Sequence, residues 1–301
     1  MGYAAVLVLG GPTIGNVGLV EALDGLGIRA ALVCPSEARR FVRLEDVAIA
    51  RLDVRTTVDG VEEGLLELFL LERSGARVLN SARSLLVCHD KLLTARRLER
   101  EGLPHPRTAH AADERALLAL EPPFVVKPRF GSWGRDVMRC RDRAELERCL
   151  REIRERSWFR RHGALVQELL PPAEHDLRVV VAGGRVVGAA ERTAAPGEWR
   201  TNVSLGGSIG PAEPGPEACE LATRATVATG AALAGVDLYP DASGRWTVLE
   251  LNGAVEFNAV YSLAGRDVYA DLAEALELAG GCPVLSGGMV GKTGHRGAGG
   301  E

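Results

Sequence analysis

Three oxygen-bearing side chains in two neighbouring segments are the residues best suited to chemistry. Asp237 lies in a strand-like run, and Glu250 and Asn252 lie two residues apart in the next such run. Alternate residues of a strand share a face, so Glu250 and Asn252 should point the same way. The turn-like segment 241–244 predicts a hairpin that brings Asp237 beside them. Two carboxylates and an amide oxygen suit Mg²⁺, and the alternative is the solvated face of an ordinary strand.

Two lysines form the second group of interest. The chain has only three lysines, Lys91, Lys127 and Lys292, among its 36 basic residues. Where arginine serves as the general cation, a retained lysine indicates a place that needs a compact ammonium group. Lys127 ends a strand-like run and precedes the glycine-bounded loop 131–134, whose backbone N–H groups would cover phosphates. With Mg²⁺ nearby, this set predicts a phosphate-handling site, and ordinary surface lysines are the alternative.

Length and composition set the broad class of the protein. A chain of 301 residues suggests about two domains. Its net charge of −4 gives no reason to expect a nucleic-acid partner. No apolar run approaches the roughly 18 residues of a membrane span, so we expect no membrane association. The six cysteines are scattered along the chain, which favours reduced thiols and a cytoplasmic location.

Apolar runs and turn signals divide the chain into four parts. Residues 1–82 have the pattern of βαβ units, residues 83–165 form a central lobe, and residues 166–282 form a strand-rich C-terminal lobe. Residues 283–301 are rich in glycine without periodicity, so we expect a disordered tail. The predicted strands are 4–9, 30–33, 77–79, 124–127, 137–139, 166–170, 177–181, 186–192, 235–239 and 246–251, and the predicted helices are 17–26, 61–73, 91–101 and 142–156.

Two glycine-rich segments imitate nucleotide-binding motifs. Residues 10–15 follow a strand but do not match G-x-G-x-x-G, so we expect an ordinary strand-to-helix turn. The alternative for this segment is a contact with substrate. A dinucleotide-dependent oxidoreductase is the most remote of the function classes considered. Residues 287–293 resemble a phosphate-binding loop, but Ser286 stands where the first glycine is required. We assign that segment to the tail.

Taken in order, the motifs form a pattern that no single one provides. They are Asp90-Lys91, Val126-Lys127-Pro128, Gly131-Ser132-Trp133-Gly134, Gln167-Glu168, Asp176-Leu177-Arg178, Arg200-Thr201-Asn202, Gly206-Gly207, Asp237 and Glu250-Leu251-Asn252. The ordered set resembles the ATP-grasp ligases, and within them the RimK/LysX group, over about residues 80–278. This resemblance implies an α/β protein with the ATP-grasp fold. Two α+β lobes would hold ATP, preceded by an N-terminal Rossmann-like pre-ATP-grasp domain.

The resemblance also implies a role for each matching residue. The ATP-binding set would be Lys91, Lys127, Ser132, Trp133, Gly134, Glu168, Leu169, Asp176, Arg200, Thr201 and Asn202. Within it, Glu168 and Leu169 would meet adenine and Asp176 would hold ribose. Asp237, Glu250 and Asn252 would bind Mg²⁺ or Mn²⁺. The catalytic residues would be Arg192, facing an acyl phosphate, and Lys127 on the phosphates.

By the same resemblance, the activity is amide formation. ATP would phosphorylate a glutamate-like carboxylate, and the amine of an amino acid would displace phosphate, with catalysis by positioning and charge stabilisation. The carboxylate donor could be an acidic amino-group carrier protein, with which the arginine-rich stretch 129–161 is compatible; a solvated helix face is the alternative.

Two other activities stay open. One is an α-glutamate ligase acting on a protein or peptide terminus. The other is a non-catalytic ATP-binding regulator, because Leu205 and Thr193 stand where the group usually has arginine. A homo-oligomer is also open.

Overall fold

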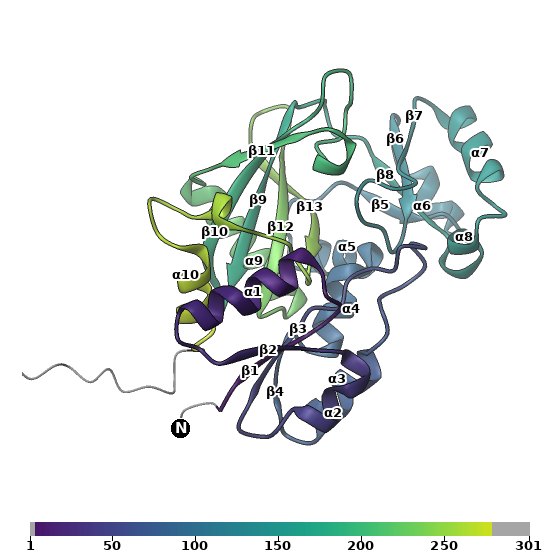
Figure 1. Cartoon of the computed structure of the whole chain (residues 1–301). Helices are drawn as coiled ribbons and strands as arrows, with labels where there is room; N and C mark the ends of the chain where they lie inside the picture. The colour runs from purple at the N-terminus through teal and green to yellow at the C-terminus, as the bar shows by residue number, and fades with distance from the viewer. Residues whose placement is uncertain (1–3, 279–301) are drawn as a thin grey trace, which may run out of the picture.

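The computed structural model describes residues 4–278 and arranges them around three sheets (Figure 1). The predicted tail at 283–301, with Lys292, lies outside the described residues. Within residues 4–278, no helix is both long and apolar enough to cross a membrane. The mixed α/β class predicted from the sequence is confirmed.

The N-terminal domain is a parallel sheet flanked by helices. Its strands lie in the order β2-β1-β3-β4, and each neighbouring pair is parallel. The elements are β1 Val6–Leu9, α1 Ile14–Gly25, β2 Ala30–Val33, α2 Ala38–Phe41, β3 Val47–Ala50, α3 Leu65–Arg73 and β4 Arg77–Leu79. Strands β1 and β3 are buried along their whole length, as the continuous apolar runs of a parallel sheet require. The segment 10–15 forms the turn into α1, whose N-cap Thr13 accepts a hydrogen bond from the backbone N–H of Asn16.

Two helices lead into an antiparallel central sheet with the strand order β5-β8-β6-β7. The elements are α4 Ala82–His89, α5 Lys91–Arg100, β5 Thr108–His110, α6 Glu114–Leu118, β6 Phe124–Pro128, β7 Met138–Cys140, α7 Arg143–Glu152, α8 Ser157–His162 and β8 Ala164–Glu168. The fully buried Phe124 packs with Trp158 and Val166 in the core of this lobe. Because β8 belongs to the central sheet, we place the lobe boundary after Glu168, whereas the sequence pattern had suggested residue 165.

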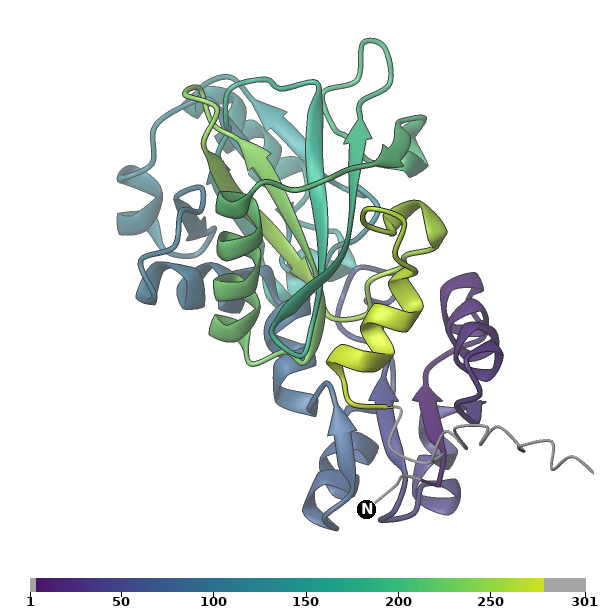
Figure 2. The same ribbon diagram turned by 90° about the vertical axis from the view of Figure 1, so that its left-hand side faces the viewer.

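The C-terminal lobe is a five-stranded antiparallel sheet with the order β11-β10-β9-β12-β13. Its elements are β9 His175–Ala182, β10 Arg185–Thr193, β11 Ser208–Pro211, α9 Pro216–Thr229, β12 Leu233–Pro240, β13 Trp246–Asn252 and α10 Val268–Ala275. The sheet is covered on both faces (Figure 2). Val179 and Val181 share a core with residues of α9, whereas Val180 and Ala182 share one with α10. This follows from the period-two alternation of a strand buried on both sides.

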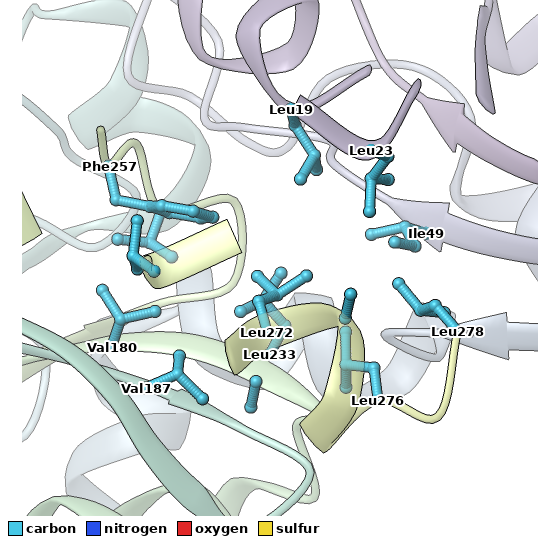
Figure 3. Packing of buried hydrophobic residues seen from close by; sticks show 14 of the residues in the cluster. Leu19, Leu23, Ile49, Val180, Val187, Leu233, Phe257, Leu272, Leu276 and Leu278 are labelled. Atoms are coloured by element: carbon cyan, nitrogen blue, oxygen red, sulfur yellow. The ribbon is translucent and has the colours of Figure 1, made fainter. Parts of the chain in front are cut away.

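The N-terminal domain and the C-terminal lobe are joined by one apolar core (Figure 3). Leu19 and Leu23 of α1 and Ile49 of β3 belong to the same cluster as Leu233 of β12 and Leu272 of α10. All five side chains are at most 1% exposed. The N-terminal sheet is therefore packed against the five-stranded sheet of the C-terminal lobe by hydrophobic burial.

The predicted elements are confirmed, with two helices shorter than expected. The helix predicted from residue 61 begins at Leu65, because residues 54–61 form a hairpin-like bridge instead. The helix predicted over 142–156 ends at Glu152 and is followed by α8. The sequence pattern missed three short strands and several helices, which are β3, β5, β11, α2, α4, α6, α8, α9 and α10.

Asn80 fastens the exit of the N-terminal domain to the large sheet. Its side chain is 1% exposed. Nδ2 donates to the carbonyl oxygens of Leu233 (2.7 Å) and Gly253 (3.0 Å). Oδ1 accepts from the backbone N–H groups of Ala232 (2.6 Å) and Leu233 (2.9 Å). One amide therefore satisfies four buried backbone groups beside β12 and β13.

We expect Asn80→Ala to lower the free energy of unfolding by about 3 kcal/mol, because it leaves several backbone N–H and carbonyl groups without a hydrogen-bond partner. Urea unfolding measures this difference. Asn258→Ala is the matched control, since Asn258 is exposed and its side chain accepts a single hydrogen bond, from Val260. That control should cost about 1 kcal/mol or less. Equal losses in the two variants would contradict the role given to Asn80.

Candidate active site

A single cavity between the central and C-terminal sheets collects the predicted site residues. It is bordered by β6, by the loop between β6 and β7, by the end of β8, and by strands β9, β10, β12 and β13. The predicted residues that line it are Lys91, Lys127, Ser132, Trp133, Gly134, Glu168, Leu169, Asp176, Arg192, Arg200, Thr201, Asn202, Asp237 and Glu250. Asn252 is the exception.

The two predicted metal carboxylates are direct neighbours on adjacent strands. Asp237 of β12 is the register partner of Glu250 of β13, and opposed residues of an antiparallel pair share a face. The register shifts by one residue immediately afterwards, which leaves Leu249 as a bulge. Because of this bulge, the consecutive residues Leu249 and Glu250 both line the cavity.

Asn252 lies one pair further along the same strands. Its register partner is Gly235, and its Oδ1 accepts a hydrogen bond from the backbone N–H of Ala254 at 2.9 Å. The amide oxygen therefore shapes the turn after β13, although it retains a second lone pair. The structure does not bring this predicted third ligand into the cavity wall.

Lys91 connects Glu250, a predicted metal ligand, to the glycine loop. It is the first residue of α5, and Asp90 caps that helix by accepting from the backbone N–H of Leu92 at 3.1 Å. Lys91 Nζ lies 3.0 Å from Glu250 Oε2 and donates to the carbonyl oxygen of Gly131 at 2.6 Å. Burial alone would raise the pKa of Glu250, but attraction to Lys91 and Lys127 outweighs it and places the pKa below its ordinary value.

Lys127 differs from Lys91 because it has no ion pair within residues 4–278. It is 8% exposed and borders the cavity. Burial lowers its pKa to about 8; Glu250 opposes this shift and Lys91 adds to it. Near neutral pH it is a partly desolvated cation without a counter-ion, which favours binding of an anion.

Two arginines and two aspartates form a buried network beside these groups. Arg178 donates through Nε and Nη2 to the two carboxylate oxygens of Asp237, at 2.7 and 2.8 Å. Arg192 donates in the same bidentate way to Asp176, at 2.7 and 2.6 Å, and its Nη2 also donates to Asp237 at 2.8 Å. The hydroxyl of Thr201 donates to Asp176 as well.

The network shifts the pKa values of its two acids in opposite directions. Burial alone would raise the pKa of Asp237, but Arg178 and Arg192 hold it well below its ordinary range. For Asp176, burial prevails over Arg192 and the pKa is raised. The residue predicted to hold ribose and the residue predicted to face an acyl phosphate are thus bonded to each other, next to the predicted metal carboxylate.

The glycine loop closes one side of the cavity. Arg200 donates to the carbonyl oxygen of Gly134 at 3.0 Å. The hydroxyl of Ser204 donates to the carbonyl oxygen of Trp133 at 3.1 Å. Gly134 has φ +68°, and a Cβ there would lie 2.9 Å from Asn202 Oδ1. Only glycine allows both this backbone conformation and this close approach.

Glu168 and Leu169 line the cavity where the chain leaves β8. The carboxylate of Glu168 accepts from Arg107 at 3.1 Å and from the backbone N–H of Glu121 at 3.0 Å. The backbone N–H of Leu169 donates to the carbonyl oxygen of Pro123 at 2.8 Å. A backbone contact from Leu169 to a base would therefore use its carbonyl oxygen.

Sequence reasoning assigned no role to Arg178, although it is the bidentate partner of Asp237. The signal was present, because Asp176 and Arg178 are two apart on one strand and must share a face. The apolar lining residues Tyr239 and Leu249 were also missed. Their types do not distinguish a cavity wall from an ordinary core.

The donor set fits Mg²⁺ held jointly with phosphates. Within residues 4–278 no cluster of three or more His, Cys, Asp or Glu side chains could hold a metal ion by itself. Mg²⁺ commonly uses one or two protein carboxylates and completes its shell with water and substrate phosphates. Asp237 and Glu250, paired in register beside two lysines, are the residues that would hold the ion there.

Comparison with known proteins agrees with this geometry. The RimK-like ATP-grasp domain matches residues 88–276. The glutamate–LysW ligase ArgX of Sulfolobus acidocaldarius is 32% identical over 209 residues, which cover 67% of this chain and 73% of that protein. A probable alpha-L-glutamate ligase of Aeromonas salmonicida is 32% identical over 269 residues, covering 86% of this chain and 87% of the relative.

A solved structure shares the fold. The ATP-grasp ligase PsnB, complexed with a phosphomimetic variant of its minimal precursor, Mg and ADP, superposes with a TM-score of 0.63 at 19% identity. The match covers 92% of this chain and 99% of PsnB. The predicted ATP-grasp fold and the predicted class of carbon–nitrogen ligase are therefore confirmed. This chain belongs to the RimK-like ATP-grasp family.

Proposed function

We propose that this protein uses ATP and Mg²⁺ to join a glutamate-like carboxylate to the amino group of an amino acid through an acyl phosphate. One observation carries the proposal. Two lysines and two register-paired carboxylates meet a glycine loop in a single cavity, with Lys91 touching both Glu250 and the loop. Family membership supports the same activity.

The residues divide the work by charge. Lys127, and Lys91 with it, would bind phosphate oxygens as compact cations. Asp237 and Glu250 would hold Mg²⁺, and Mn²⁺ is an alternative metal with the same oxygen ligands. Mg²⁺ held by these carboxylates would offset the negative charge of the phosphates during transfer. Arg192, which borders the cavity and donates to Asp237 at 2.8 Å, would stabilise negative charge on an acyl phosphate.

The substrates are proposed from the relatives. The names of the two sequence relatives share glutamate, and one also names LysW. We infer that glutamate or a similar amino acid is one substrate and that an acidic carrier supplies the carboxylate. An alpha-glutamate ligase acting on a peptide or protein terminus is the second candidate, favoured by the Aeromonas relative.

The arginine-rich stretch gives the carrier limited support. Many of its arginines are neutralised locally, for example by ion pairs of Arg141 with Glu145 and of Arg161 with Asp59. Arg139 and Arg154 are exposed and make no ion pair within the described part of the chain. These two would be the points of contact for an acidic partner.

A cytoplasmic location and a homo-oligomer complete the proposal. Five cysteines are free within the described residues, which suits a reducing compartment. Light scattering on the purified chain tests the oligomer.

The activity is tested with ATP, Mg²⁺, glutamate and a peptide that ends in glutamate. We expect ADP release only when both an amine and a carboxylate are present, and a product heavier than the peptide by one glutamyl residue. Free glutamate in place of the peptide tests whether a carrier-like acceptor is needed. Nucleotide binding without substrate-dependent ADP release would instead indicate a regulator, as Leu205 and Thr193 suggest.

Lys127 should give ATP use a pH dependence. Its pKa of about 8 means that the binding charge is present below that pH and lost above it. We expect kcat/KM for ATP to fall by up to about tenfold per pH unit above about pH 8, because that ratio reports free-enzyme pKa values. In Lys127→Arg this decline should disappear while affinity at neutral pH falls. An unchanged decline in the arginine variant would assign the titration to another group.

Glu250→Gln should remove most Mg²⁺-dependent activity and leave the fold intact, because Glu250 is one of two metal carboxylates and its side chain keeps 30% exposure. Asp237→Asn should also lower the melting temperature, since it removes the negative charge that Arg178 and Arg192 pair with in a buried site. A Mg²⁺ titration of ADP release, followed by thermal unfolding, separates the two effects. Parental Mg²⁺ dependence in both variants would remove the metal assignment.

A further inference from the structure

A hairpin of the N-terminal domain reaches across to the central lobe. It lies between β3 and α3, where Val54 and Val61 form an antiparallel bridge. The backbone N–H of Arg55 donates to the carbonyl oxygen of Gly60 at 2.9 Å and closes the turn. Residues 56–60 form its tip, and none of them lines the cavity described above.

The tip inserts an apolar side chain into the core of another lobe. Val58 is 5% exposed and belongs to the same buried cluster as Phe124 and Val126 of β6. Lys127 follows Val126 directly on that strand. Val58 also has φ +51°, a conformation that β-branched residues rarely adopt. Its burial in the central lobe offsets this backbone strain.

Polar contacts fix the tip to helix α8. Arg161 Nη1 lies 2.9 Å from Asp59 Oδ2, and Asp59 is 9% exposed. His162 Nε2 donates to the carbonyl oxygen of Asp59 at 2.9 Å. The hydroxyl of Thr57 donates to Asp59 Oδ1 at 2.6 Å and holds that carboxylate toward α8. The tip is therefore held by an apolar anchor and by two consecutive residues of one helix.

The same contacts extend to the glycine loop. Arg135, directly after Gly134, donates to the carbonyl oxygen of Thr56 at 3.1 Å. Asp136 accepts from the indole N–H of Trp158 at 2.8 Å, which ties the loop to α8. The residues that directly follow the glycine loop are thus held by the hairpin and by α8.

We propose that the tip at residues 56–60 is a positioning element for the nucleotide. It seats the central lobe and its glycine loop on the N-terminal domain, so that the lobes cannot part for nucleotide release until this contact breaks. The strength of a contact outside the cavity then sets how long the nucleotide stays bound. This inference rests on the proposed use of ATP.

The test measures dissociation of a fluorescent ATP analogue in the presence of Mg²⁺, by displacement with unlabelled ATP. Val58→Asn replaces the apolar anchor with a polar side chain that tolerates positive φ. We expect about tenfold faster dissociation, a matching rise in the KM for ATP, and a KM for the amine unchanged within about twofold. Arg161→Ala should accelerate dissociation by about threefold, as loss of one partly exposed ion pair would.

Arg160→Ala is the matched control, because Arg160 lies on the same helix and pairs with Glu155, away from the hairpin. Its dissociation rate should equal that of the parent chain. Parental rates in folded Val58→Asn overturn the inference. Should that variant not fold, equal rates in Arg161→Ala and Arg160→Ala overturn it instead. A parent that binds nucleotide without ligating refutes the proposed function alone, and a parent that binds none refutes both.

Discussion

Charge that is buried in the five-stranded sheet must be neutralised within it, and this constraint fixes the geometry of the site. Asp237 is 3% exposed, and taking such an ion out of water costs several kcal/mol unless it is paired and hydrogen-bonded. The register supplies a partner on one side, where Arg178 lies opposite Asp237, whereas the residue opposite on the other side, Glu250, is a second acid. The row of charges continues to Lys91, which neutralises Glu250 from α5. Strand pairing and electrostatics therefore require the same arrangement.

One face of this sheet serves two purposes. Arg178 and Val180 are alternate residues of β9, so they lie on the same face. Near Val180 that face is covered by α10 and by the N-terminal domain in a shared apolar core (Figure 3). Near Arg178 it carries the charged network and borders the cavity. The apolar part anchors a rigid platform, and the adjoining part holds the reactive groups in place.

The central lobe is attached to the rest of the molecule partly by polar contacts. They include the ion pairs of Lys91 with Glu250 and of Arg161 with Asp59, and the hydrogen bond that Arg200 donates to the carbonyl oxygen of Gly134. The hairpin tip adds Val58 as a buried apolar contact. Phe130, which follows β6, adds a second apolar contact in the core of the N-terminal domain, so both contacts must separate before the lobes can part to release a nucleotide.

The sequence by itself determined the residue types, their order and most of the strands. Alternation of side chains in β13, the strand ending in Asn252, and the lysine before the glycine loop were enough to predict a phosphate and metal site. The short strands β3 and β5 were not predicted, because strands of four and three residues show too little periodicity to be recognised. Only tertiary structure decided that a bulge at Leu249 turns Glu250 into the cavity while Asn252 remains outside its wall. Likewise, only tertiary structure joined Arg178 to Asp237 and Val58 to the central lobe, because strand register and contacts between lobes depend on residues far apart in the chain.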